Sequence, residues 1–410
     1  MTYYRHTLNN GIRLIHKSVS NGVAHCGIMI NTGSRDEKEN EQGLTHFIEH
    51  TIFKGTKRRK SYHILSRLEN IGGEINAYTT KEEICVYASF LPKYYDRTLE
   101  LFSDIFNNST FPSHEIDKEK DVIIDEINSY KDNPFEEIYD EIEDIVFEGH
   151  SIGRNILGTE DLVRSYTKKN ITGFIDSKFN TDETVICSVG NFNFNDYIKL
   201  CEKYFGDYKA NNRNFKRQEF NNYIPKTIIQ PKGLHQAHCI IANKAYSALD
   251  EKRTALTLLN NVLGGPGLNT RLNMGIREKY GFCYNIESNY SPFSDTGIIT
   301  IYLGTDFASL DKTLQLTHKE LDKLKNKKLG SLQLHRAKQQ LIGQIAISQE
   351  SNINELLSMA KSILVYDKIE PIEVINQEIE AVTAEQLISI AQEVFERDQL
   401  SMLVYRGIDN

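Results

Sequence analysis

The chain of 410 residues lacks the features that mark several broad classes of protein. Lysine and arginine number 48 against 56 acidic residues, and no basic patch stands out, which argues against a nucleic-acid-binding protein. No apolar run is long enough to cross a bilayer, and the opening Met-Thr-Tyr-Tyr-Arg-His contains no signal-peptide core. We therefore expect no membrane partner and a cytoplasmic location.

Cysteine is also scarce, and its spacing excludes a close Cys-x-x-Cys pair. Most of the six cysteines lie in apolar, strand-like runs, where a small side chain fits a buried position. Reduced thiols of this kind are typical of a cytosolic protein rather than of a disulfide scaffold.

The most informative feature that is present is the pentapeptide His46-Phe47-Ile48-Glu49-His50. Apolar residues recur at helical spacing from Gly43 to Phe53, so the motif is predicted to lie on a helix that is at least half buried. Histidines four residues apart share one helix face, and Glu49 lies on the same side. This arrangement predicts a zinc site with its own general base.

A catalytic zinc site usually takes three protein ligands, so a distant carboxylate is expected to complete this one. Glu119 and Glu126 are seven residues apart and share a helix face. We predict Glu126 as the third ligand and Glu119 as a residue that supports the ligands from behind. The alternative is a solvated face, because Lys118 and Lys120 flank Glu119.

These residues resemble the inverzincin metallopeptidases, the family of pitrilysin, insulin-degrading enzyme and the mitochondrial processing peptidase, named for a reversed H-x-x-E-H motif. The resemblance runs along most of the chain. Beyond the motif it includes Asn76-Ala77-Tyr78-Thr79 before an alternating strand, Glu119 with Glu126, His150 to Thr159 ending in Asn-Ile-Leu-Gly-Thr, and Arg277 with Tyr284. It implies a zinc endopeptidase with one Zn²⁺ per chain.

The length exceeds what one hydrophobic core usually supports, and the chain shows signs of duplication. Ala24-His25-Cys26 and Ala237-His238-Cys239 each open a strand that leads to a helix. Aligned on these triplets, the second helix carries Leu259, Val262 and Leu263 where the first carries His46, Glu49 and His50.

We therefore predict an α+β protein of two homologous, α/β-sandwich-like domains, of which only the first binds metal. The resemblance implies that they form a clamshell around a peptide chamber. The expected boundaries are residues 1–208 for the catalytic domain, a polar linker at 209–226, and residues 227–410 for the domain that completes the active site.

In the family, an arginine and a tyrosine seven residues apart stabilise the tetrahedral intermediate, and Arg277 and Tyr284 match them. The other interpretation is a glycine-rich helix entry after residues 264–267, with Arg277 in a surface ion pair. A phosphate loop is disfavoured because no Gly-Lys-Ser/Thr follows these glycines.

Substrate contacts follow from the same resemblance. Asn76 and Ala77 lie on a predicted strand like those that capture peptide by edge addition in relatives, although Asn76 would also suit a turn. Glu136 and Asp140 fall ten and fourteen residues after Glu126. In the processing peptidase, acidic residues at these two offsets from the zinc-binding glutamate recognise an arginine near the cleaved bond. This predicts a preference for basic peptides, with a solvated acidic face as the alternative.

Two further functions compete with a peptidase. A non-catalytic subunit or scaffold of a peptidase-like complex characteristically loses motif residues, whereas this chain keeps them all. A structural metal site would need a fourth protein ligand and no free base beside the metal. Family members of this size pair two chains, so we expect a homodimer, with a hetero-oligomer containing a related subunit as the other possibility.

Overall fold

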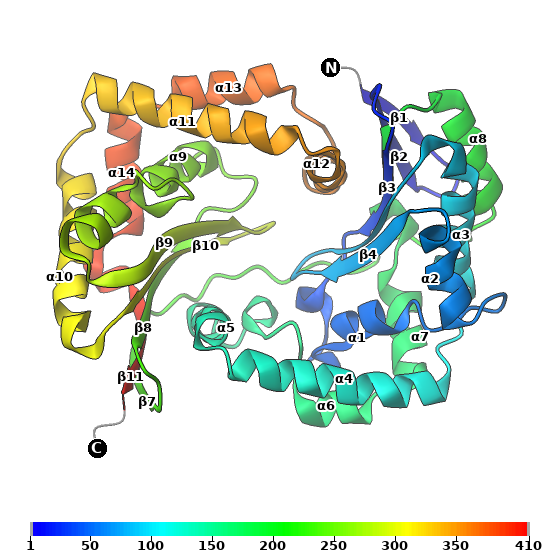
Figure 1. Ribbon diagram of the computed structural model, residues 1–410, viewed down its shortest axis with the longest axis horizontal. Helices are drawn as coiled ribbons and strands as arrows, with labels where there is room; N and C mark the ends of the chain where they lie inside the picture. Colours follow the sequence, from blue (N-terminus) through cyan, green and yellow to red (C-terminus); the bar gives the residue numbers. More distant parts are fainter. Residues whose placement is uncertain (1–2, 408–410) are drawn as a thin grey trace. The chain divides into compact units, whose positions relative to one another are not determined.

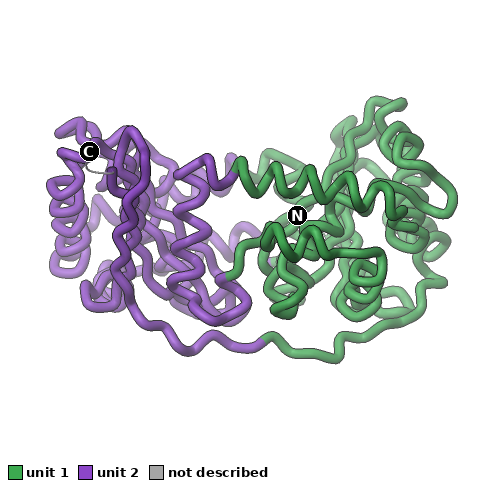
Figure 2. Tube along the Cα trace, turned by 90° about the horizontal axis from the view of Figure 1, so that it is seen from below, with its two compact units in different colours: residues 1–129, 154–217, 348–369 green, residues 130–153, 218–347, 370–410 purple. Residues whose placement is uncertain are grey.

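A computed structural model describes residues 3–407, and it divides the chain into two compact units (Figure 2). The first unit contains residues 1–129, 154–217 and 348–369. The second contains residues 130–153, 218–347 and 370–410. Each unit is thus assembled from three separate stretches of the chain.

The first unit is built on a six-stranded sheet with the order β1-β2-β6-β3-β5-β4 (Figure 1). Its strands are β1 (Tyr3–Thr7), β2 (Arg13–Ser18), β3 (Ala24–Ile30), β4 (Glu74–Thr79), β5 (Ile84–Phe90) and β6 (Thr184–Gly190). Its helices are α1 (Leu44–Thr51), α2 (Ser61–Glu69), α3 (Tyr95–Asn108), α4 (Ser113–Lys131), α6 (Glu160–Ser165), α7 (Lys168–Lys178), α8 (Phe194–Phe205) and α12 (Asn352–Tyr366).

The second unit is built on a five-stranded sheet with the order β7-β11-β8-β10-β9. Its strands are β7 (Thr227–Lys232), β8 (Ala237–Ala245), β9 (Cys283–Pro292), β10 (Gly297–Thr305) and β11 (Ser401–Gly407). Its helices are α5 (Pro134–Val146), α9 (Arg253–Gly264), α10 (Leu310–Asn326), α11 (Ser331–Gln349), α13 (Ile372–Ala381) and α14 (Ala384–Val394).

The two sheets repeat one topology. In the first, β2 runs parallel to β6, and β6, β3, β5 and β4 then follow as antiparallel neighbours. In the second, β7 runs parallel to β11, and β11, β8, β10 and β9 follow in the same manner. The two Ala-His-Cys triplets open the corresponding strands β3 and β8. The predicted duplicated α+β fold is therefore confirmed.

The units differ from the continuous domains expected from the sequence because two helices pack with the other half of the chain. α12 buries Leu356, Met359 and Ile363 against residues of the first sheet such as Met29 and Val185. α5 lies on the second sheet, where its buried residues Ile138 and Ile142 contact β8 and β11. Each helix has one apolar face, and nothing in that pattern tells which of two similar sheets it covers.

The predicted linker contains no helix or strand between Lys209 and Lys226, but its first part is held firmly. Arg217 donates to both carboxylate oxygens of Asp36, at 3.0 and 2.8 Å, and Arg213 donates to the same carboxylate at 3.3 Å. Because Asp36 is buried, these charge-assisted hydrogen bonds tie the segment to the first unit.

The six cysteines are all free and buried, as predicted. No helix within residues 3–407 combines the length and hydropathy needed to span a lipid bilayer.

The placement of α12 gives a stability prediction. Leu356 is fully buried against the first sheet, so Leu356→Ala should destabilise that unit by about 2 to 5 kcal/mol through lost burial and a residual cavity. Hydrogen exchange should quicken at backbone amides of β3 and β6 more than at those of β8 and β10. Leu332→Ala, at a 58% exposed helical leucine, is the matched control. Faster exchange confined to β8 and β10 would contradict the placement.

Candidate metal centre

The helix α1 is fixed at its start by backbone geometry and by a buried carboxylate. Gly43 precedes it with a φ of 86°, and a Cβ at this position would lie 2.4 Å from the carbonyl oxygen of Leu157. Glycine alone suits both conditions. The Glu37 carboxylate accepts hydrogen bonds from the backbone N–H groups of Gly43, at 2.9 Å, and Thr45, at 2.7 Å. Two of the free N–H groups at the helix start are thereby satisfied.

The apolar face of α1 packs against the core of the unit. The two motif histidines lie on a different face of the helix. Leu44, Phe47 and Ile48 are buried in the unit. His46 and His50 are one helical turn apart, and their ring centroids are separated by 4.6 Å. The local sequence therefore presents two imidazoles side by side.

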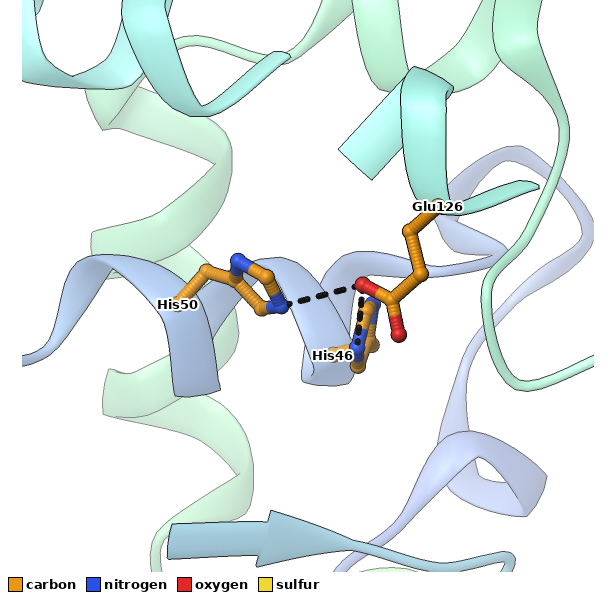
Figure 3. Close-up of side chains that lie close together, drawn as sticks. All are labelled: His46, His50 and Glu126. Atoms are coloured by element: carbon orange, nitrogen blue, oxygen red, sulfur yellow. Dashed lines mark ion pairs between the residues drawn. The ribbon is translucent and has the colours of Figure 1, made fainter. Parts of the chain in front are cut away.

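Glu126 of α4 meets both imidazoles (Figure 3). Its Oε2 lies 3.3 Å from His50 Nε2 and 3.7 Å from His46 Nε2. One ligand atom from each residue falls within 4.8 Å of the others, and within residues 3–407 this is the one such group of three or more potential metal ligands. The three predicted ligands are thus brought together from two helices.

The donor set fits zinc. Two imidazole nitrogens and one carboxylate oxygen form a His₂Glu set, which is found in catalytic zinc sites. Zinc bonds to such donors are about 2.1 Å long, so neighbouring donors of a tetrahedral site lie roughly 3.4 Å apart. The nitrogen-to-oxygen distances of 3.3 and 3.7 Å agree with that spacing. Three protein ligands would leave a fourth position on a zinc ion for water or substrate.

Glu119, predicted to support the ligands from behind, lies beside His50. Its Oε2 lies 3.2 Å from His50 Nδ1, the nitrogen on the opposite side of the ring from Glu126. Its Oε1 lies 2.7 Å from Lys54 Nζ. A carboxylate behind a histidine ligand fixes the tautomer and orientation of the ring. Lys54 was not predicted, although its position four residues after His50 is a signal for proximity.

The charges around the histidines act in opposite directions on the two rings. Burial lowers the pKa of His46 to about 4, and the nearby charge of His50 adds to this effect. Burial also acts to lower the pKa of His50, but Glu119 and Glu126 outweigh it and raise that pKa to about 9. Two carboxylates therefore favour positive charge at His50, where a divalent cation would be stabilised in the same way.

Glu49 lies on α1 between the two histidines and is half-buried. Burial raises its pKa above the usual value for glutamate, because desolvation disfavours the carboxylate. A carboxylate with a raised pKa accepts a proton more readily than an ordinary carboxylate, as a general base requires. The helix also packs against β4, which brings the strand of Asn76 and Ala77 to the same region.

β4 is an edge strand of the first sheet. It pairs with β5 on one side, where Asn76 lies opposite Tyr87 and Ala77 opposite Val86. Asn76 is exposed and lies inside the strand, so the alternative of a turn residue is wrong. An edge strand offers backbone groups to which an extended peptide can add.

The remaining predicted site residues belong to the second unit. Arg277 lies in a π-helical turn, Asn273–Glu278, and donates to Asn273 Oδ1 at 3.3 Å. Tyr284, at the start of β9, is 77% exposed. Glu136 and Asp140 lie one turn apart on α5. π-turns inside helices are frequent at functional sites, and no feature of the residue pattern predicted this one.

In the repeat, the helix α9 corresponds to α1 and carries no metal ligands. Leu259 and Leu263 are buried, and Val262 packs partly buried against the same core. The aligned positions thus contribute packing in the second unit, where α1 presents histidines and a glutamate in the first.

Comparisons with known proteins agree with this fold. Residues 13–160 match the insulinase domain of peptidase family M16, and residues 165–341 match the M16 inactive domain. The chain belongs to peptidase family M16. The inactive-domain match includes α9, which lacks metal ligands.

Relatives and solved structures cover almost the whole chain. It is 32% identical to the "Uncharacterized zinc protease YmxG" of Bacillus subtilis over 98% of this chain and 97% of that protein. It is 30% identical to an "Uncharacterized zinc protease" of Rickettsia felis, over 97% and 96% respectively. A protease from Helicobacter pylori has a similar fold, with a TM-score of 0.88 at 20% identity over 99% of both chains. An M16 inactive-domain protein of Pseudomonas fluorescens gives a TM-score of 0.93 at 17% identity, over 100% of this chain and 99% of that one.

The support of His50 by Glu119 gives a testable prediction. Glu119→Gln should weaken zinc binding by about 10- to 100-fold, because the carboxylate that orients the ring and raises its basicity is lost. Competition with a chromophoric chelator measures the affinity. Glu115→Gln, on the same helix but paired with Lys118 at the surface, is the control. Equal zinc affinity in both variants would show that Glu119 does not support the metal site.

Proposed function

We propose that this chain is a zinc-dependent endopeptidase that hydrolyses unfolded or short peptides. The observation that carries the proposal is the convergence of His46, His50 and Glu126, with Glu49 on the same helix as the histidines. A zinc ion held by these three residues would supply a Lewis acid that makes water nucleophilic near neutral pH.

Glu49 is the general base in this proposal. Its carboxylate takes a proton from the attacking water and passes it to the leaving amine. The raised pKa suits both steps, because the group must hold the proton briefly and then release it. Glu119 keeps the His50 ring oriented through the hydrogen bond at Nδ1.

Peptide is bound, in this proposal, by addition to the free edge of β4. Main-chain hydrogen bonds at Asn76 and Ala77 would hold an extended substrate with little dependence on its side chains. Arg277 and Tyr284 would donate to the oxyanion as negative charge develops, where preorganised donors lower the barrier most. This role requires the two units to close over the peptide, as the family resemblance implies.

Glu136 and Asp140 are the candidates for selectivity. Their neighbours Glu137 and Glu141 are engaged by Lys232 of β7, so the acidic helix is not uniformly a solvated face. Glu136 is exposed and carries a charge that could attract a basic side chain. A preference for basic residues near the cleaved bond is therefore part of the proposal. A homodimer and a cytoplasmic location stay predictions.

The test is hydrolysis of quenched peptides by the purified chain, with zinc content measured on the same sample. We expect cleavage that a chelator abolishes and added Zn²⁺ restores. A peptide with arginine at the cleaved bond should be cut faster than a matched peptide with alanine. Zinc without cleavage of any peptide would favour the non-catalytic subunit, and equal cleavage of the matched pair would remove the basic preference alone.

A further inference from the structure

The first unit contains a second candidate binding site, a cavity of about 540 Å³ that includes none of the residues of the metal centre. Its floor is apolar and is formed by Ile28 and Ile30 of β3 and Ile186 of β6. Side chains alternate along a strand, and Met29 packs toward α12, so the cavity lies on the opposite face of the sheet from α12. Its volume falls in the range typical of small-molecule sites.

Three phenylalanine rings lie in the walls at the places where helices end, and Tyr208 also lines the cavity. Phe106 lies in the last turn of α3, Phe179 directly follows α7, and Phe205 is the last residue of α8. Because these helices end here, they leave a part of the sheet face without a helix above it. The cavity can therefore accept a large apolar group.

The rim carries two opposite charges. Asp176 and Lys209 both line the cavity and are exposed, and neither side chain makes a hydrogen bond or ion pair within the described part of the chain. Two residues after Lys209, the side-chain amide of Asn211 donates to the backbone carbonyls of Asp176, at 3.1 Å, and Phe179, at 3.3 Å, which ties the segment that carries Lys209 to the end of α7. One anion and one cation are thus free at the same opening.

We propose that this cavity binds a zwitterion with large apolar side chains, namely an apolar amino acid or dipeptide. The apolar side chains occupy the cavity between the three phenylalanine rings. The ammonium group pairs with Asp176 and the carboxylate pairs with Lys209, so that both rim charges are used. A fatty acid would use Lys209 only, and an alkylamine would use Asp176 only.

The site is distinct from the proposed peptidase centre and does not depend on catalysis. If the chain does hydrolyse peptides, the ligand has the chemistry of its smallest products. Binding itself is expected whether or not the chain is active.

Calorimetric titration of the full chain with Leu-Phe tests the charge requirement. We expect a Kd of about 1 mM or tighter. Acetylation of the amine or amidation of the carboxylate should each weaken binding by about fivefold, because each removes one charge-assisted contact at an exposed rim. No binding, equal binding of the capped forms, or tighter binding of dodecanoate would overturn the proposal.

Surface variants locate the site without risk to the fold. Asp176→Asn should weaken the binding of Leu-Phe by about fivefold but leave the affinity for acetyl-Leu-Phe unchanged. Lys209→Gln should likewise weaken the binding of Leu-Phe by about fivefold but leave the affinity for Leu-Phe-amide unchanged. Asp161→Asn and Lys169→Gln, at exposed positions on α6 and α7, are the controls. Binding of Leu-Phe at the metal centre would survive both rim variants and would overturn the proposal.

Discussion

Glu49→Gln should lower the rate of peptide hydrolysis by about 10²- to 10⁴-fold, the usual contribution of a positioned general base. The substitution keeps the size of the side chain and removes its ability to accept a proton. Glu49 is not among the three clustered donors, so zinc content should stay close to that of the wild type. The pair of measurements therefore separates proton transfer from metal binding.

The pH profile gives an independent readout of the same residue. Glu49 must be ionised to accept a proton, so activity should fall as the pH drops below its raised pKa. In Glu49→Gln, the activity that remains should no longer fall as the pH is lowered through this range. Glu69→Gln, at an exposed position on α2, controls for the change of charge. Full activity in Glu49→Gln would refute its role as base, whatever the zinc content.

His50→Gln should remove both zinc and activity. His50 contributes a potential donor atom 3.3 Å from Glu126, and its other nitrogen contacts Glu119. Its loss leaves one imidazole and one carboxylate of the three clustered donors, one ligand fewer than a catalytic zinc site usually has. We expect bound zinc to fall from about one per chain to less than about a tenth, with hydrolysis at the level of chelated wild type.

Two measurements show whether this loss is local. Elemental analysis gives the zinc content, and circular dichroism gives the helical content of the same sample. His63→Gln is a matched control, because His63 is an exposed histidine on the helix α2 of the same unit. Normal zinc content in His50→Gln would overturn the ligand assignment.

The sequence predicted the local geometry of the metal centre well, because helical spacing alone determines which side chains share a face. His46 with His50 and Glu119 with Glu126 are each related by whole helical turns, and the structure brings the two pairs together. The repeated topology could also be predicted from the sequence, since matching Ala-His-Cys triplets mark matching strands.

Contacts between residues far apart in the sequence could not be predicted in this way. Asp36 accepts hydrogen bonds from Arg213 and Arg217, which lie 177 and 181 residues later in the sequence. No periodicity connects such positions. The packing of α5 on the second sheet and of α12 on the first was unpredictable for a similar reason. An amphipathic helix fits the face of either sheet of a duplicated fold.

The position of α12 late in the chain has a consequence for folding during synthesis. Residues 352–366 cover a face of the sheet whose strands all lie before residue 191. The ribosome therefore releases the strands of the first sheet long before the helix that covers their apolar face, including Ile15, Met29 and Val185. Apolar surface of this kind promotes aggregation until it is covered. The nascent chain thus leaves this apolar surface uncovered by its own helix until residues 352–366 have emerged.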